Sequence, residues 1–203
     1  MSLYAPPRAV AAHIFSTVPD ELRRKHGKPD WARSNRPNGE ADCFLEGPSF
    51  DLAGNLWLVD VPYGRIFKVT PEGEWSVVCE YDGWPNGLKL HPDGRAFIAD
   101  YKHGILVLEP GEKAPRPLVT HRYSEHFRGC NDLIFSSTGK LYFTDQGQSG
   151  MHMPNGRVFA YDLGTEKLDL LLDTGPSPNG IVLSDDESML YVGMTRGNNV
   201  WRL

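Results

Sequence analysis

A fifteen-residue pattern that occurs four times constrains the fold of this chain more than any other feature. Each copy opens with a carboxylate or carboxamide residue, passes through an apolar stretch and a polar turn, and ends in a second apolar stretch. The copies begin 40 to 48 residues apart (86 − 46 and 179 − 131 are the extremes). A period of this length, made of short strands, is typical of a β-propeller with one blade per period. The four copies are Glu46–Asp60, Asn86–Asp100, Asn131–Asp145 and Asn179–Gly193.

Each period also predicts the further strands of a blade. In the first period, strands are expected at 47–50, 56–60, 64–69 and 75–79. The turns between them are rich in Asp, Gly and Asn, which tolerate positive φ or bond their own backbone. Almost no helix-period pattern follows residue 40. The sequence therefore predicts an all-β chain with about four propeller blades over residues 41–203.

The first 40 residues differ in kind from the repeats. They show no strand alternation, and they contain a Pro-Pro pair and one candidate short helix at Pro19–Lys25. Asp20 and Glu21 suit the N-terminus of that helix. We interpret residues 1–40 as an N-terminal segment of its own. It is either a surface arm or entry strand, or a lid over a cleft at one end of the propeller.

Two long connections and the end of the chain complete the predicted layout. Tyr123–Gly129 and Gln146–Asn155 are long and unusual in composition, which predicts loops over one end of the structure. Val200–Leu203 would form the third strand of the fourth blade, and no closing segment follows. Because unpaired strand edges are a liability, we expect a fragment, completion by another chain, or a closure that the sequence does not reveal.

The composition narrows the class of protein. Hydrophobic content of 40% and charged content of 23% suit a soluble globular chain. A net charge of −5 offers no basic footprint for nucleic acid, and no apolar run is long enough to span a membrane. There is no recognisable signal peptide, and the odd number of cysteines, three, favours a reducing compartment. We therefore expect a cytoplasmic protein, whose oligomeric state the sequence does not indicate.

The opening residues of the four copies are the main functional candidates. The first strand of each propeller blade lines the central channel, so equivalent residues should converge at one end of it. Carboxylate and carboxamide oxygens without Cys or His form the ligand set of a hard cation. Ca²⁺ fits this set best, with Mg²⁺, Zn²⁺ and Mn²⁺ as alternatives. The four residues are Glu46, Asn86, Asn131 and Asn179.

This interpretation has structural alternatives. Asn followed by Gly is a common turn pair, so Asn86 and Asn179 could belong to turns without a ligand role. The aspartates that end the second strands can instead cap loops or bond a neighbouring blade, and the histidines of the connections can be ordinary surface residues. Arg128 is either a contact for an anionic or polyol substrate or an exposed arginine. The aspartates at the ends of the second strands are Asp60, Asp100 and Asp145, and the histidines are His103, His126 and His152.

Three motifs carry a family resemblance. Leu45–Pro48, Gly129–Asp132 and Ser177–Ile181 resemble motifs of the senescence marker protein, gluconolactonase and luciferin-regenerating enzyme family, and the architecture is similar to that of diisopropylfluorophosphatase. The resemblance covers roughly residues 41–203. It implies a six-bladed propeller with a divalent metal, often calcium, held in the channel by Glu46, Asn131 and Asn179. The family's further ligand is an Asp in a later Asp-Gly motif, one blade on, and this sequence ends before that point.

The resemblance implies a metal-dependent hydrolase of sugar lactones or related esters, with the metal acting as a Lewis acid. Its small-molecule substrate would meet Glu46, Asn131 and Asn179 at the reacting centre and Asn86 and Arg128 beside it. The four opening residues of the copies form a ring around the channel in this interpretation. Glu46 is expected to carry the only formal negative charge of this ring. Phosphotriester-type hydrolysis at the same metal, and a non-enzymatic binding scaffold with a structural ion, are the alternatives.

Overall fold

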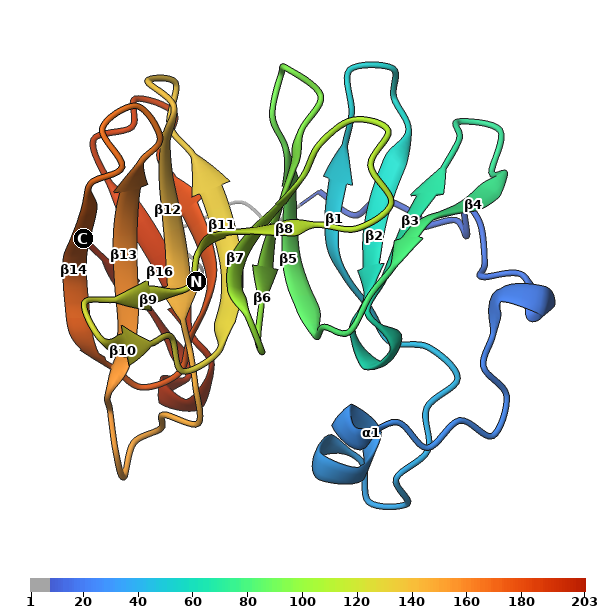
Figure 1. Cartoon of the computed structure of the whole chain (residues 1–203), viewed down its shortest axis with the longest axis horizontal. Helices are drawn as coiled ribbons and strands as arrows, with labels where there is room; N and C mark the ends of the chain where they lie inside the picture. Colours follow the sequence, from blue (N-terminus) through green and yellow to red (C-terminus); the bar gives the residue numbers. More distant parts are fainter. Residues whose placement is uncertain (1–7) are drawn as a thin grey trace.

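Four β-sheets stand side by side like the blades of a propeller (Figure 1). The computed structural model describes residues 8–203. The first three sheets have four antiparallel strands each, and the fourth has three. Blade 1 contains β1 (Leu45–Phe50), β2 (Leu56–Asp60), β3 (Arg65–Val69) and β4 (Trp75–Glu80); blade 2 contains β5 (Pro85–Leu90), β6 (Ala96–Asp100), β7 (Gly104–Leu108) and β8 (Arg116–Val119). Blade 3 contains β11 (Cys130–Phe135), β12 (Lys140–Asp145), β13 (Gly156–Asp162) and β14 (Leu168–Gly175); blade 4 contains β15 (Pro178–Leu183), β16 (Leu190–Met194) and β17 (Asn199–Arg202).

The first strands of consecutive blades are neighbours. β5 lies beside β1, β11 beside β5, and β15 beside β11. The predicted all-β propeller arrangement, with four blades in this chain, is thereby confirmed. Because successive strand residues point to opposite faces, each blade buries apolar side chains against the blade before it and the blade after it. Blades 1 and 2 meet around Val59 and Ile98, blades 2 and 3 around Phe97 and Phe143, and blades 3 and 4 around Val158 and Val192.

The turn of the fourth blade is one residue longer than the corresponding turns of the other three. In blade 1 the N–H of Asp51 donates to the carbonyl of Asn55, four residues on, and blades 2 and 3 repeat this spacing. In blade 4 the N–H of Ser184 donates to Met189, five residues on. The repeat boundary predicted at Gly193 was therefore wrong by one residue. Met194 takes the register position that Asp60 holds in blade 1.

The N-terminal segment packs on blade 1. The hydroxyl of Ser16 accepts a hydrogen bond from the Trp75 indole at 2.9 Å, and a guanidinium N–H of Arg65 donates to the carbonyl of Leu22 at 2.7 Å. The helix predicted at 19–25 is a short 3₁₀ turn, η1 (Asp20–Leu22). The six-residue helix α1 (Asp30–Asn35) was not predicted. Residues 1–7 of the predicted arm lie outside the described residues, and its role as a lid stays a prediction.

The remaining elements gather at the end of the propeller where the first strands begin (Figure 1). β9 (His121–Arg122) and β10 (Glu125–His126) form a small hairpin, so the first predicted connection contains a strand. The 146–155 connection reaches the same end. Short 3₁₀ turns η2 (Val61–Tyr63) and η3 (Thr195–Gly197) join the second and third strands of blades 1 and 4.

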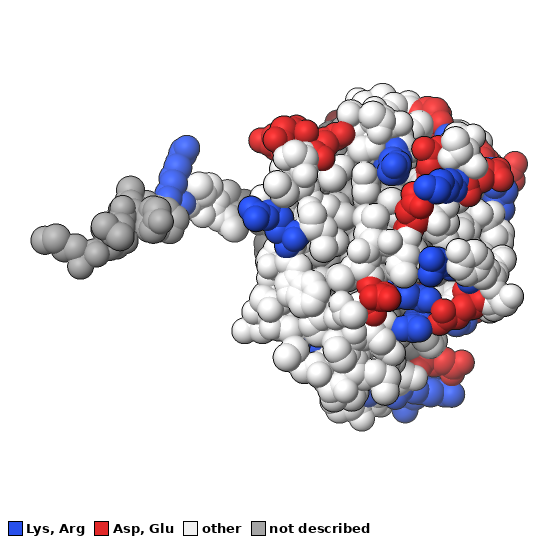
Figure 2. Space-filling model, turned by 90° about the vertical axis from the view of Figure 1, so that its left-hand side faces the viewer, with Lys and Arg blue, Asp and Glu red and all other residues white. Residues whose placement is uncertain are grey.

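The surface seen in Figure 2 carries basic and acidic side chains interspersed with one another, not gathered into one basic patch. Within residues 8–203, no helix is both long and apolar enough to cross a lipid bilayer.

Candidate functional site

A β-bulge lies at the start of every first strand, where the sequence motif begins. In β11, Cys130 pairs with Asp145 but Leu133 pairs with Phe143, so the first strand holds one residue more than its partner. The same irregularity recurs in β1, β5 and β15. A bulge re-aims the side chains beside it and bends the strand. The repeated bulge therefore gives the four motif residues a common backbone setting.

Glycine at the second motif position lets neighbouring first strands approach closely. A Cβ added to Gly47 would lie 2.6 Å from the carbonyl oxygen of Asn86, and one added to Gly87 would lie 2.8 Å from that of Asn131. Larger residues would push the strands apart. Gly47 also has a φ of +58°, a region that L side chains rarely adopt.

The four predicted ring residues line one cavity. It has a volume of about 220 Å³ and lies between the starts of the first strands of all four blades. The structure therefore brings together the residues that the repeat placed in register, each of them half-buried. Its lining consists of Glu46, Gly47, Pro48, Asn86, Gly87, Lys89, Asn131, Asp132 and Asn179.

Sequence reasoning missed two charged residues of this cavity, Lys89 and Asp132. The expectation that Glu46 is the only formal negative charge was therefore wrong. A signal for Asp132 was present, because it occupies the motif position that holds glycine in the other three copies. Its carboxylate is held between two blades: one oxygen accepts from the N–H of Leu133 at 2.9 Å, and the other from that of Ile181 at 3.1 Å.

The electrostatics of the cavity centre on Glu46. Burial raises the pKa of its carboxyl above the ordinary value, and the nearby charge of Asp132 raises it further. The backbone N–H of Gly47 opposes this shift by favouring the charged form. Within residues 8–203, no basic side chain is among the groups that act on this pKa, so the negative charge lacks a positively charged partner. A cation placed between Glu46 and Asp132 would supply it.

The three ring asparagines have different partners. The Asn131 side-chain Nδ2 donates to Oε1 of Gln146 at 3.0 Å, which leaves its carbonyl oxygen free of that bond. Within residues 8–203, no hydrogen-bond partner is found for the side chains of Asn86 and Asn179. These carboxamides therefore remain available to a ligand or substrate.

The ring chemistry fits a hard cation better than a soft one. Among residues 8–203, no three His, Cys, Asp or Glu side chains gather as a metal site, so carboxylates alone do not form one. The cavity instead combines two carboxylates and three carboxamides with one lysine, Lys89. Ca²⁺ accepts such mixed oxygen sets with variable coordination.

The aspartates that end the second strands do not reach this cavity. All three are fully buried and bond within the structure. Asp60 accepts from the Phe44 N–H at 2.8 Å and from Nε of Arg65 at 2.9 Å. Asp145 accepts from the Gly129 N–H and from Nε of Arg157, and Asp100 from the Tyr81 hydroxyl and two backbone N–H groups. They cap the segments that lead into the first and third strands.

Arg128 and the loop histidines also lie outside the cavity lining. The Arg128 guanidinium donates to Glu125 at 2.9 Å and to the carbonyl of Asn155 at 2.6 Å, so it joins the two long connections. His126 and His152 are exposed, as is His103. The role of Arg128 in substrate binding stays a prediction.

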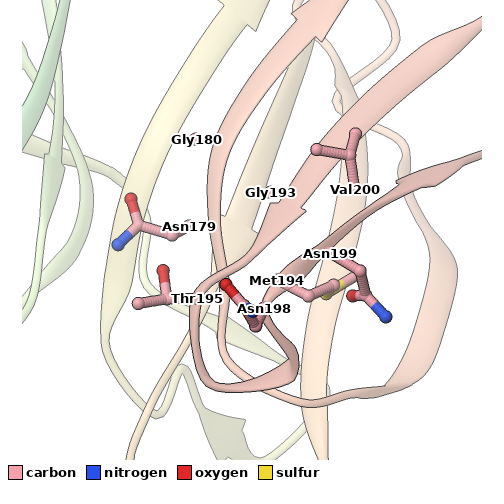
Figure 3. A pocket seen from close by; sticks show the side chains of 8 residues that line it. All are labelled: Asn179, Gly180, Gly193, Met194, Thr195, Asn198, Asn199 and Val200. Carbon is pink, nitrogen blue, oxygen red and sulfur yellow. The ribbon is translucent and has the colours of Figure 1, made fainter.

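A second cavity, of about 450 Å³, lies along blade 4 between the start of β15 and η3 (Figure 3). Asn179 borders both cavities. In Figure 3 its carboxamide extends to the opposite side from Asn199 and Val200. The side chain therefore projects away from the outer part of blade 4.

Comparisons with known proteins agree with this architecture. A family model described as "SMP-30/Gluconolactonase/LRE-like region" matches residues 44–203. Lactonase drp35 of Staphylococcus aureus strain MRSA252 is 33% identical over 167 residues, which cover 78% of this chain and 50% of that protein. Lactonase drp35 of Staphylococcus epidermidis strain RP62A is 34% identical over 169 residues, with the same coverage. The chain thus spans about half the length of the curated relatives it matches.

Solved structures show the same fold at lower identity. A gluconolactonase of Xanthomonas campestris superposes with a TM-score of 0.70 at 21% identity, over 79% of this chain and 58% of that one. A luciferin-regenerating enzyme gives a TM-score of 0.60 at 18% identity, over 78% of this chain and 54% of that one.

Proposed function

Because the chain belongs to the SMP-30/gluconolactonase/LRE-like family, we propose that it carries the channel site of a metal-dependent hydrolase of sugar lactones or related esters. The observation that supports this most is the convergence of four repeat-related oxygen residues and Asp132 on one cavity of about 220 Å³. The relatives named lactonase drp35 support the substrate class. The three cysteines are free, which supports a cytoplasmic location.

The proposed cofactor is a divalent cation, Ca²⁺ first and Mg²⁺, Zn²⁺ or Mn²⁺ as alternatives. Glu46, Asn131 and Asn179 would hold it, since all three line the cavity and offer oxygen ligands. When bound, the ion supplies Lewis-acid polarisation of an ester carbonyl and stabilises the negative charge that develops on its oxygen. The carboxylates of Glu46 and Asp132 would balance the charge of the ion.

The other residues of the cavity position the substrate. Asn86 offers a carboxamide without a hydrogen-bond partner among residues 8–203, and it can bond a sugar hydroxyl with either its oxygen or its amino group. Lys89 adds a positive charge to the same lining, on β5. A polyol with a polarised carbonyl finds donors and acceptors on several sides of this cavity, which a purely apolar pocket does not offer.

A chelator experiment tests the proposal. Acid release from aldonolactones is followed by pH-stat with the chain as isolated, after chelation, and after each divalent cation is added back. We expect hydrolysis to stop on chelation and to return with Ca²⁺, and Glu46→Gln to abolish the recovery. Hydrolysis that ignores the chelator contradicts the metal mechanism. The absence of hydrolysis with every cation would favour a binding scaffold.

A further inference from the structure

A chain of hydrogen bonds runs from the cavity into the interior of blades 3 and 4. It starts at Asn131, whose Nδ2 donates to Oε1 of Gln146 at 3.0 Å. Gln146 in turn donates from Nε2 to the Ser177 hydroxyl at 2.8 Å. Gln146 follows β12 directly, outside the repeated pattern, so no comparison of the four copies would single it out.

The far end of this chain is firmly anchored. Ser177 and Ser149 are both buried, with at most 2% of their surface exposed. The Ser149 hydroxyl accepts from the Ser177 N–H at 3.0 Å and donates to the backbone carbonyl of Gln146 at 2.5 Å. Because both the backbone and the side chain of Gln146 are bonded, its carboxamide has a defined position beside the cavity.

The orientation of Asn131 decides what the cavity offers to a cation. A carboxamide has an acceptor end and a donor end of nearly the same shape. With Nδ2 bonded to Gln146, the carbonyl oxygen is left for the cavity. The reverse orientation would present an amino group, which repels a cation.

Gln146 is particular to blade 3. The residues that follow the second strand at the same register position are Val61 in blade 1, Tyr101 in blade 2 and Thr195 in blade 4. Within residues 8–203, neither Asn86 nor Asn179 has a comparable side-chain bond. Asn131 is therefore the ring residue whose orientation the protein sets in advance.

We propose that Gln146 is a positioning residue for the cavity: it holds Asn131 with its carboxamide oxygen toward the cavity and so raises the affinity for a hard divalent cation. The effect on affinity rests on the proposed function, whereas the hydrogen bond does not. Partners behind a metal ligand typically contribute about 10–100-fold to metal affinity. We expect the lower end of that range, because Asn131 is one of several ligands.

The test compares three variants of the full chain. Gln146→Leu removes the acceptor, and Gln146→Glu keeps an acceptor for Nδ2. Gln148→Leu is the matched control: Gln148 lies two residues along the same connection, is exposed, and bonds Tyr101 and Arg196 instead. For each we measure side-chain amide proton exchange of Asn131 by ¹⁵N NMR, calcium affinity by calorimetry, and thermal unfolding.

We expect Gln146→Leu to speed exchange of the Asn131 amide protons and to weaken calcium binding about tenfold. Gln146→Glu should keep slow exchange and retain calcium affinity, and Gln148→Leu should change neither. Unchanged amide exchange in Gln146→Leu overturns the proposal, as does a fall in thermal stability with calcium affinity intact. If Gln146→Leu does not fold, Ser177→Ala decides, because it frees Gln146 and should also speed the exchange; slow exchange there overturns the proposal.

The two proposals fail separately. If the unmodified chain binds no calcium but loses amide protection in Gln146→Leu, the positioning role stands and the metal-dependent function falls. If calcium binds and Gln146→Leu binds it equally well, the function stands and the positioning role falls.

Discussion

The channel residues and the strand-end aspartates both recur from blade to blade, yet their polar atoms are used in opposite ways. Asp60 and Asp145 are fully buried, and backbone N–H groups and arginines bond their oxygens. Glu46 and Asn179 are half-buried and face a shared cavity. Repetition therefore marks a position in the fold. The hydrogen-bond partners at that position separate a structural role from a binding role.

The energetic reason is the cost of burying charge. A buried carboxylate is tolerated when a cation and N–H donors satisfy it, and removing one partner is then strongly destabilising. Among the groups of residues 8–203 that act on the Glu46 pKa, only the backbone N–H of Gly47 favours the charged form, and no basic side chain is present. The same side-chain chemistry thus stabilises the fold at one end of β2 and leaves a site open at the start of β1.

The largest expected effect is on the structural side of this comparison. Asp60→Ala leaves Arg65 buried without its carboxylate, and we expect a loss of about 3–5 kcal/mol in the free energy of unfolding. Urea denaturation measures it. Asp60→Asn, which keeps the shape, is the matched control and should cost less. A loss below about 1 kcal/mol would show that Asp60 is not the structural cap described above.

Glu46→Gln should have the opposite profile. Removing one of two carboxylates from the cavity should lower calcium affinity by about 100-fold, or ~2.7 kcal/mol, with no loss of stability. Calorimetry and thermal unfolding on the same samples separate the two quantities. Unchanged calcium affinity would remove Glu46 from the ligand set. A large drop in unfolding temperature would place it with the strand-end aspartates.

The pH dependence of stability tests the same contrast between Glu46 and the strand-end aspartates. The pKa of Glu46 in the folded chain lies above its ordinary value of 4.5, so the folded state holds the proton more tightly than the unfolded state. Its contribution to stability is then present below the ordinary pKa and is lost as pH rises through the folded pKa. In calcium-free buffer, the stability of the unmodified chain relative to Glu46→Gln should therefore fall as pH rises from about 4. A difference that rises with pH would mean that the pKa of Glu46 is depressed.

The smallest effect is expected at Arg128, which belongs to neither group. Its ion pair with Glu125 is partly exposed, so Arg128→Ala should cost at most about 1 kcal/mol of stability and leave calcium affinity unchanged. The predicted substrate role adds a separate outcome, a higher KM for lactones with kcat preserved. Steady-state kinetics beside urea denaturation distinguishes the two. An unaltered KM would mean that Arg128 only joins the two long connections through its bonds to Glu125 and Asn155.

The sequence by itself determined the propeller and the membership of the ring. Turn residues such as those at 51–55 can be recognised locally, and the number of times they recur gives the number of blades. Equivalent positions of successive blades face one axis, so the register of Glu46, Asn86, Asn131 and Asn179 was enough to predict that they share a cavity. Local pattern and global symmetry agree here, which is why that prediction required no contact information.

Only the tertiary structure decided which groups complete the site and how they are held. The bulge in each first strand depends on pairing with a second strand, and the bond from Asn131 to Gln146 depends on where the end of β12 lies. The charge of Asp132 acts on Glu46 because β1 and β11, the strands that carry these residues, both lie beside β5. These contacts join residues far apart in the chain, and a one-dimensional pattern carries no record of such distances.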